Sequence, residues 1–155
     1  MKHGQRLVCG PYKVDAIGPV VGFVLDQIQA HERTLIRLHG DLGAGKTFLV
    51  ASILHALGLN QQVPVQSPTF ALMHEYKFGR IHAAHLDLYR LNGTQDLSEI
   101  TGADFERYNL VFVEWSDRMG GGFDANLIID IEIRPTDSAD SRIYEIVLCE
   151  GKIHD

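Results

Sequence analysis

Residues 40–47 have the residue types and the spacing that bind polyphosphate. Their sequence, GDLGAGKT, fits the pattern G-x-x-x-x-G-K-[ST] in full, and it stands between an apolar strand-like segment and an amphipathic helical one. Glycine allows the chain to curl tightly, so that backbone N–H groups surround an anion and no side chain blocks its approach. The helix that follows directs its free N–H groups and the positive end of its dipole at the same point. The sequence therefore predicts a phosphate-binding loop (P-loop).

Two side chains at the end of this loop add a positive charge and a metal ligand. Lys46 is expected to reach the β- and γ-phosphates of a nucleotide, and the Thr47 hydroxyl is expected to ligate Mg²⁺. The loop residues that we expect to bind the nucleotide are Asp41, Leu42, Gly43, Ala44, Gly45, Lys46 and Thr47.

Acidic residues end two segments that have the composition of strands. Glu114 ends the apolar run LVFVE, and Asp87 ends a strand-like segment within HLDLYR. P-loop enzymes complete the Mg²⁺ site with a carboxylate at the end of a neighbouring strand, and Mg²⁺ keeps several waters, so either acid can act directly or through one. We expect Lys46, Asp87 and Glu114 to carry the catalysis. The sequence leaves open which acid binds the metal and which positions water, and an acid at a strand end is also common as a loop charge or a helix cap.

A short loop, Ser67-Pro68-Thr69, is a candidate switch. Proline holds Ser67 extended, and the Thr69 hydroxyl is expected to sense the γ-phosphate. A simple turn with solvated hydroxyls is the alternative. We interpret His85 as a structural histidine and Trp115 as an aromatic residue of the core or of the pocket rim.

Alternation of strand-like and helix-like segments indicates an α/β protein. We expect a first strand over 5–9 that Gly10-Pro11 ends, and a short helix over 96–100 that begins with a capping box of Asp96 and Glu99. Further strands are expected at 34–39, 71–76, 81–87, 110–114, 128–134 and 143–149, and further helices at 14–28 and 46–57. Of these strands, 71–76 with 81–87 and 128–134 with 143–149 are expected to form antiparallel pairs.

Length and charge limit the possible organisation and partners. With 155 residues, of which 45% are hydrophobic, the chain is expected to form one P-loop ATPase domain over 1–155. The formal net charge is −6, and no basic patch of the kind that binds nucleic acid is visible, so contact with RNA is expected only through a partner. Apolar runs of membrane-span or signal-peptide type are not found either, so we expect a cytoplasmic location and no membrane association.

The four motifs GDLGAGKT, SPTF, HLDLYRL and EWSDR, in this order and at these separations, resemble the TsaE (YjeE) family. Its members are small bacterial ATPases of tRNA threonylcarbamoyladenosine synthesis. The likeness runs from about residue 35 to residue 118, over half of the chain. Many proteins share the P-loop, whereas DLYR and EW at these separations are far more particular.

The resemblance implies a P-loop NTPase-like three-layer fold with a mixed parallel and antiparallel central sheet. It implies ATP and Mg²⁺ as cofactors, slow hydrolysis by the isolated protein, and association with the TsaB–TsaD pair. That pair attaches the threonylcarbamoyl group to adenosine 37 of tRNAs that read ANN codons. ATP turnover is implied to support repeated cycles of the transferase rather than to form the new bond.

The family's residue roles carry over to matching positions. The resemblance gives Lys46 and Thr47 the phosphate and metal roles, Glu114 a metal role, and Asp87 the place of the DLYR acid. It also matches the SPT loop, with Thr69, to a switch-like loop.

One further position matches the family pattern weakly, and two places depart from it. Arg142 falls where the family often has an arginine close to the nucleotide, although the flanking residues agree poorly. Phe48 stands where a second Thr or Ser is usual, which leaves its backbone N–H to hold the α-phosphate. The run GGGFDAN at 120–126 replaces a usual Leu-Pro step and leaves the path of that loop open.

Two other functions are consistent with a P-loop. A small-molecule or nucleotide kinase needs an acceptor pocket and usually an arginine-rich lid, and the sequence has no arginine cluster that would form one. A nucleotide-binding scaffold without turnover is disfavoured by the two strand-end acids, Glu114 and Asp87. Hydrolysis by the chain alone is expected to be slow, since no arginine stands at an obvious finger position, and such a residue contributes about 10³–10⁵ in rate.

Overall fold

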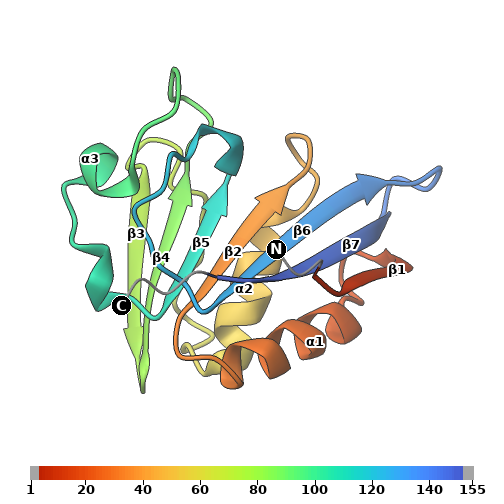
Figure 1. Cartoon of the computed structure of the whole chain (residues 1–155). Coiled ribbons are helices and arrows are strands. Elements are labelled where there is room, and N and C mark those ends of the chain that lie inside the picture. The colour runs from red at the N-terminus through yellow and green to blue at the C-terminus, as the bar shows by residue number, and fades with distance from the viewer. Residues whose placement is uncertain (1–3, 152–155) are drawn as a thin grey trace.

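A seven-stranded sheet forms the centre of the molecule, with the strand order β1-β7-β6-β2-β5-β4-β3 (Figure 1). The computed structural model describes residues 4–151. The strands are β1 (Arg6–Lys13), β2 (Thr34–His39), β3 (Met73–Phe78), β4 (Ile81–Asp87), β5 (Leu110–Glu114), β6 (Leu127–Pro135) and β7 (Ser141–Glu150). Pairs β1–β7, β6–β7 and β3–β4 are antiparallel, and the other pairs are parallel. The mixed α/β sheet expected from the sequence is therefore confirmed.

Four neighbouring strands, β6, β2, β5 and β4, run in the same direction, so their carboxyl ends meet at one edge of the sheet. Strand β2 leads into the P-loop and lies between β5 and β6. Asp87 and Glu114 are register partners at the ends of β4 and β5. Parallel pairing thus brings both predicted acids to the edge where the P-loop begins, the usual place for a ligand in an α/β sheet.

Helices α1 (Gly18–Gln29) and α2 (Lys46–Leu57) cover one face of this sheet (Figure 1). Residues at helical spacing, Val20, Val24 and Ile28, form the buried side of α1. The corresponding apolar residues of α2 are Leu49, Val50, Ile53 and Leu54. Within the described part of the chain, every helix is too short or too polar to cross a bilayer.

A smaller layer covers part of the opposite face. It contains α3 (Leu97–Thr101) and the short 3₁₀ helix η1 (Phe105–Arg107). Its apolar residues pack on the alternate side chains of β2, β4 and β5, including Leu35 and Val111. The glycine-rich run at 120–122 belongs to this layer, because Gly120 N donates to Gln95 O and Leu97 N donates to Gly121 O. This run, whose path the sequence left open, is therefore hydrogen-bonded along the start of α3.

Several boundaries and one helix cap differ from expectation. Strand β1 continues through Gly10-Pro11 to Lys13, because an edge strand tolerates proline and its register with β7 shifts there. Helix α1 begins at Gly18 rather than at residue 14. Within the described residues Asp96 makes no side-chain capping bond, so the capping box expected at α3 does not form.

The part of the sheet left uncovered by the smaller layer carries charged side chains. Arg37 of β2 donates through Nε and Nη2 to Asp130 of β6 at 2.7 and 2.6 Å, and His39 Nε2 lies 3.1 Å from the same carboxylate. Burial alone would raise the pKa of Asp130, but the hydrogen bonds with His39 and Arg37 outweigh it and hold that pKa below its ordinary value.

A depressed carboxyl pKa stabilises the fold above the unfolded pKa, and this contribution is lost as pH falls through the folded value. We expect Asp130→Asn to lower the free energy of unfolding at pH 7 by about 1 kcal/mol, a value limited by solvent screening. The variant should lose less stability than the parent between pH 7 and pH 3 in urea unfolding. Equal losses in both proteins would contradict this assignment.

Candidate functional site

The P-loop adopts backbone angles that glycine alone takes easily. Gly40, Gly43 and Gly45 have φ values of +152°, +79° and +106°. A Cβ on Gly40 would also lie 3.0 Å from Ala44 Cβ and 3.0 Å from the Ile133 carbonyl oxygen. The tight curl predicted from GDLGAGKT is present, and Gly40 is the position where both angle and space require glycine.

Gly40→Ala is therefore expected to destabilise the fold by about 1–3 kcal/mol, the usual cost of a side chain forced into such an angle. Gly22 is the matched control, because it lies exposed within α1 and a Cβ there would meet nothing within 4 Å. Gly22→Ala should raise stability by about 0.5–1 kcal/mol through helix propensity. Chemical denaturation measures both, and a Gly40→Ala protein as stable as the parent would refute the strain argument.

Helix α2 begins directly at the P-loop and presents free donors to it. Its first intrahelical bond runs from Leu49 N to Gly45 O at 3.0 Å. The N–H groups of Lys46, Thr47 and Phe48 therefore have no acceptor inside the helix. These donors and the positive end of the helix dipole form the anion-binding feature that the sequence predicted.

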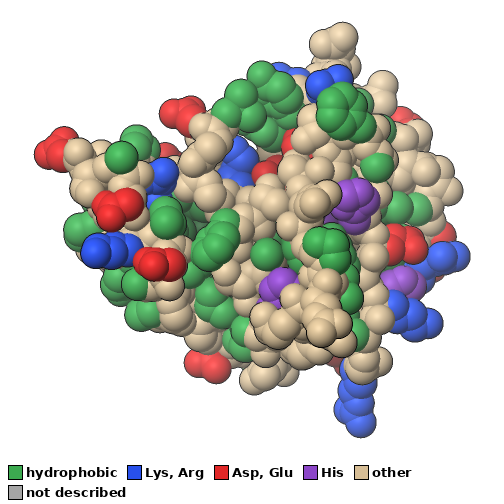
Figure 2. Space-filling model, turned by 180° about the vertical axis from the view of Figure 1, so that it is seen from behind, with side chains coloured by type: hydrophobic (Ala, Val, Ile, Leu, Met, Phe, Trp, Pro, Cys, Tyr) green, Lys and Arg blue, Asp and Glu red, His purple; other side chains and the backbone are tan. Residues whose placement is uncertain are grey.

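A cavity of about 400 Å³ opens at this point. It is lined by residues 42–48 and by Ser67, Thr69, Asp87, Tyr89, Glu114 and Trp115. In Figure 2 hydrophobic side chains gather at the upper end of the molecule, beside a hollow in which basic and acidic side chains are visible. The structure thus brings the P-loop, the SPT loop and the two strand-end acids around one pocket.

Lys46 is buried beside this pocket, with 6% of its surface exposed. Its Nζ donates to the carbonyl oxygens of Gly40 and Asp41, and it lies 4.5 Å from the centre of the Trp115 ring. Burial lowers the pKa of Lys46, and the nearby negative charges of Glu114, Asp87 and Asp41 offset part of that effect. The ammonium group is held by two neutral carbonyl groups and an aromatic ring. These are weaker partners for a cation than a phosphate anion would be.

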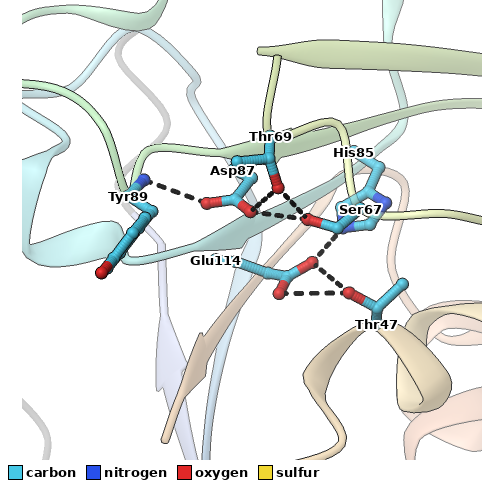
Figure 3. Close-up of polar contacts among 7 residues, drawn as sticks. All are labelled: Thr47, Ser67, Thr69, His85, Asp87, Tyr89 and Glu114. Carbon is cyan, nitrogen blue, oxygen red and sulfur yellow. Dashed lines mark hydrogen bonds and ion pairs between the residues drawn. The ribbon is translucent and has the colours of Figure 1, made fainter. Parts of the chain in front are cut away.

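Glu114 is the acid that meets the P-loop hydroxyl (Figure 3). Thr47 Oγ1 donates to Glu114 Oε2 at 3.1 Å and lies 3.4 Å from Oε1. His85 Nε2 approaches Glu114 Oε2 to 2.5 Å from the side of β4. Glu114 is 3% exposed and His85 is 0% exposed, so the contact between these two side chains is shielded from bulk water.

Asp87 instead fastens the SPT loop (Figure 3). Its Oδ2 accepts from Ser67 Oγ at 2.6 Å and from Thr69 Oγ1 at 3.1 Å, and its Oδ1 accepts from Tyr89 N at 3.0 Å. Ser67 and Thr69 therefore do not stand as solvated hydroxyls of a simple turn. The loop is tied to the end of β4, at the pocket.

Arg142 lies on the other side of the P-loop. Its Nε donates to Ala44 O at 3.2 Å, and its Nη1 donates to Ala139 O and Ser141 O at 2.8 Å each. A second cavity, of about 330 Å³, is bounded by Arg142 and by the outer side of residues 41–44. Arg142 thus supports the P-loop backbone and is separated from Lys46, Glu114 and Asp87.

The sequence interpretation missed the contact of His85 with Glu114. Residues i and i+2 of a strand point to the same face, so His85 and Asp87 of HLDLYR share one side of β4. Register then places His85 opposite Phe112 and Asp87 opposite Glu114. The alternation in HLDLYR was the available signal, but it gained meaning only from the pairing of β4 with β5.

These residues fit a nucleotide with Mg²⁺. Free N–H groups and a buried ammonium suit phosphate oxygens, and a hydroxyl beside a carboxylate supplies the oxygen ligands that Mg²⁺ takes. Mg²⁺ usually binds one or two carboxylates together with substrate phosphates rather than an all-protein cage. Thr47 and Glu114 would hold the metal, and Lys46 with the start of α2 would hold the phosphates.

Comparisons with known proteins identify the family of this chain. A model of the family described as "Threonylcarbamoyl adenosine biosynthesis protein TsaE" matches residues 19–143. A TsaE protein of Aquifex aeolicus is 36% identical over 110 residues, which cover 71% of this chain and 76% of the relative. One of Haemophilus influenzae is 32% identical over 111 residues, covering 70% and 69%.

A TsaE protein of a Nostoc species is 47% identical over 90 residues, which cover 56% of this chain and 54% of the relative, so the chain spans about half the length of that protein. Among solved structures, the crystal structure of YdiB from Bacillus subtilis superposes with a TM-score of 0.65 and 23% identity, over 95% of this chain and 88% of that one. That likeness concerns the fold. The family model and the relatives together show that this chain belongs to the TsaE family.

Proposed function

We propose that this protein binds ATP with Mg²⁺ in the P-loop pocket and hydrolyses it slowly, in support of threonylcarbamoyl transfer to adenosine 37 of tRNA. The TsaB–TsaD complex is the proposed partner and makes the contact with tRNA. A cytoplasmic location is part of the same proposal.

One observation carries the proposal above the others: free N–H groups and an ammonium group suited to phosphate lie beside two acids suited to Mg²⁺. Lys46 and the start of α2 come from the P-loop, while Glu114 and Asp87 come from adjacent parallel strands. When bound, Mg²⁺ would neutralise charge on the β- and γ-phosphate oxygens. Glu114 would orient the metal with Thr47, and Asp87 would hold Thr69 at the position expected for the γ-phosphate.

The surface around the pocket is suited to bind a partner whose affinity depends on the bound nucleotide. Apolar side chains are exposed there, with Leu42 at 67%, Phe48 at 50%, Phe70 at 85% and Tyr89 at 38%. Exposed apolar residues that gather in this way are typical of interaction sites. Since Thr69 precedes Phe70 and Asp87 binds both Thr69 and the Tyr89 backbone, a change at the γ-phosphate would reach this surface directly. Nucleotide can drive docking only by the difference in its affinity for the docked and free shapes.

Reconstituted tRNA modification with purified TsaB–TsaD and the threonylcarbamoyl donor tests the proposal. We expect one round of modification without this protein and many rounds with it and ATP, together with faster ATP hydrolysis once the pair is added. Many rounds with a non-hydrolysable ATP analogue would indicate a scaffold. Transfer of labelled γ-phosphate to a small acceptor, with no other protein present, would indicate a kinase.

A further inference from the structure

Among the described residues, the His85 side chain makes one polar contact, from a fully buried position. Its side chain is 0% exposed, and its Nε2 lies 2.5 Å from Glu114 Oε2. Its Nδ1 has no hydrogen-bond partner within residues 4–151. Its register neighbours are His74 on β3 and Phe112 on β5, and the Phe112 ring stands edge-on at 6.4 Å. A buried imidazole with one satisfied nitrogen calls for an explanation.

The contact fixes where the imidazole hydrogen lies. A carboxylate only accepts hydrogen bonds, so the hydrogen of the contact must be on Nε2. The imidazole therefore acts as a hydrogen-bond donor to Glu114 through Nε2.

The donor acts on the carboxylate that meets the P-loop. His85 and Thr47 converge on the same oxygen, Oε2 of Glu114, one from β4 and the other from α2 (Figure 3). With Oε2 held from both sides, rotation of the carboxylate is restricted and Oε1 keeps a fixed direction. Groups that hold a ligating carboxylate in this way commonly change metal affinity by about 10- to 100-fold.

We propose that His85 is a positioning residue that orients Glu114 for Mg²⁺·ATP. The inference rests on the proposed function, since it assigns His85 a role in that same site. A histidine that only filled space would affect stability and leave the metal-dependent part of nucleotide affinity unchanged. The proposal requires a donor at the Nε2 position in particular.

Two substitutions separate these roles. The side chain of Gln can place an amide donor near the Nε2 position, whereas Asn reaches only as far as Nδ1. We expect His85→Gln to keep the Mg²⁺ effect, defined as the ratio of the ATP Kd without Mg²⁺ to that with Mg²⁺. In His85→Asn this ratio should be about 10- to 100-fold smaller than in the parent, while the ATP affinity without Mg²⁺ is unchanged. His82→Asn, on the same strand but beside Tyr108, is the matched control and should keep the ratio.

Isothermal titration calorimetry gives both Kd values, and thermal melts establish that each variant is folded. Equal ratios in His85→Asn and the parent would overturn the proposal, and so would an equal loss in His85→Gln and His85→Asn. A separate measurement is made on the parent protein without nucleotide. Imidazole ¹H–¹⁵N correlation spectra of the parent, with His85 assigned from the missing signals in His85→Gln, should show the hydrogen on Nε2.

The absence of a hydrogen on Nε2 would overturn the proposal as well. Failure of the proposed function has a different signature, because the parent protein would then show no effect of Mg²⁺ on ATP affinity. In that case the spectra alone decide whether His85 holds Glu114.

Discussion

Lys46→Ala is expected to weaken ATP binding by about 10- to 100-fold, the effect of losing charge-assisted hydrogen bonds to phosphate. In the structure the ammonium group is buried at the pocket and is held only by two loop carbonyls and the face of Trp115. A bound nucleotide can therefore replace these contacts with hydrogen bonds from Lys46 Nζ to its phosphate oxygens. Multi-turnover tRNA modification should be lost together with the affinity.

Calorimetry with ATP and Mg²⁺ measures this effect directly. Lys77→Ala is the matched control, since Lys77 is exposed on β3 and does not line the pocket. The Lys46 variant should remain folded, because burial already disfavours its charge, as the lowered pKa shows. Normal ATP affinity in a folded Lys46→Ala protein would contradict the phosphate role and, with it, the proposed function.

Glu114→Gln is expected to keep the ATP affinity measured without Mg²⁺ but to lower hydrolysis by about 100-fold, which corresponds to about 3 kcal/mol of lost stabilisation at the metal. Gln has nearly the same shape as Glu, so Thr47 can still donate to its carbonyl oxygen. The charge that the metal needs is absent. Single-turnover hydrolysis and ATP titration, measured on the same preparation, separate the two effects.

Asp117→Asn is a suitable control, because Asp117 is an exposed acid only three residues further along the chain. Unchanged hydrolysis in Glu114→Gln would move the metal role to Asp87. Asp87→Asn would then be the variant that lowers hydrolysis. If Asp87 acts mainly on the loop, as its bonds to Ser67 and Thr69 indicate, its variant should instead weaken coupling to the partner.

Local features of this protein could be read from its sequence because they depend on neighbours in the chain. The P-loop is a contiguous motif, and its glycines, its lysine and the helix that follows are fixed by backbone angles and helix geometry. Residues 128–134 were likewise predicted to form a strand antiparallel to 143–149, and β6 pairs with β7 in this way. Predictions failed where local signals were weaker than packing, as at Gly10-Pro11, through which β1 continues along its pairing with β7.

Only the tertiary structure decided how the distant residues of the site combine. The residues alone left open which of Glu114 and Asp87 binds the metal, and the fold placed Glu114 beside Thr47 and Asp87 against the SPT loop. It also joined His85 to Glu114 and put Arg142 on the far side of the P-loop. These contacts depend on strand order and register, since a shift of one residue would turn each side chain to the opposite face. That register is set by the packing of the whole sheet, which no short stretch of sequence contains.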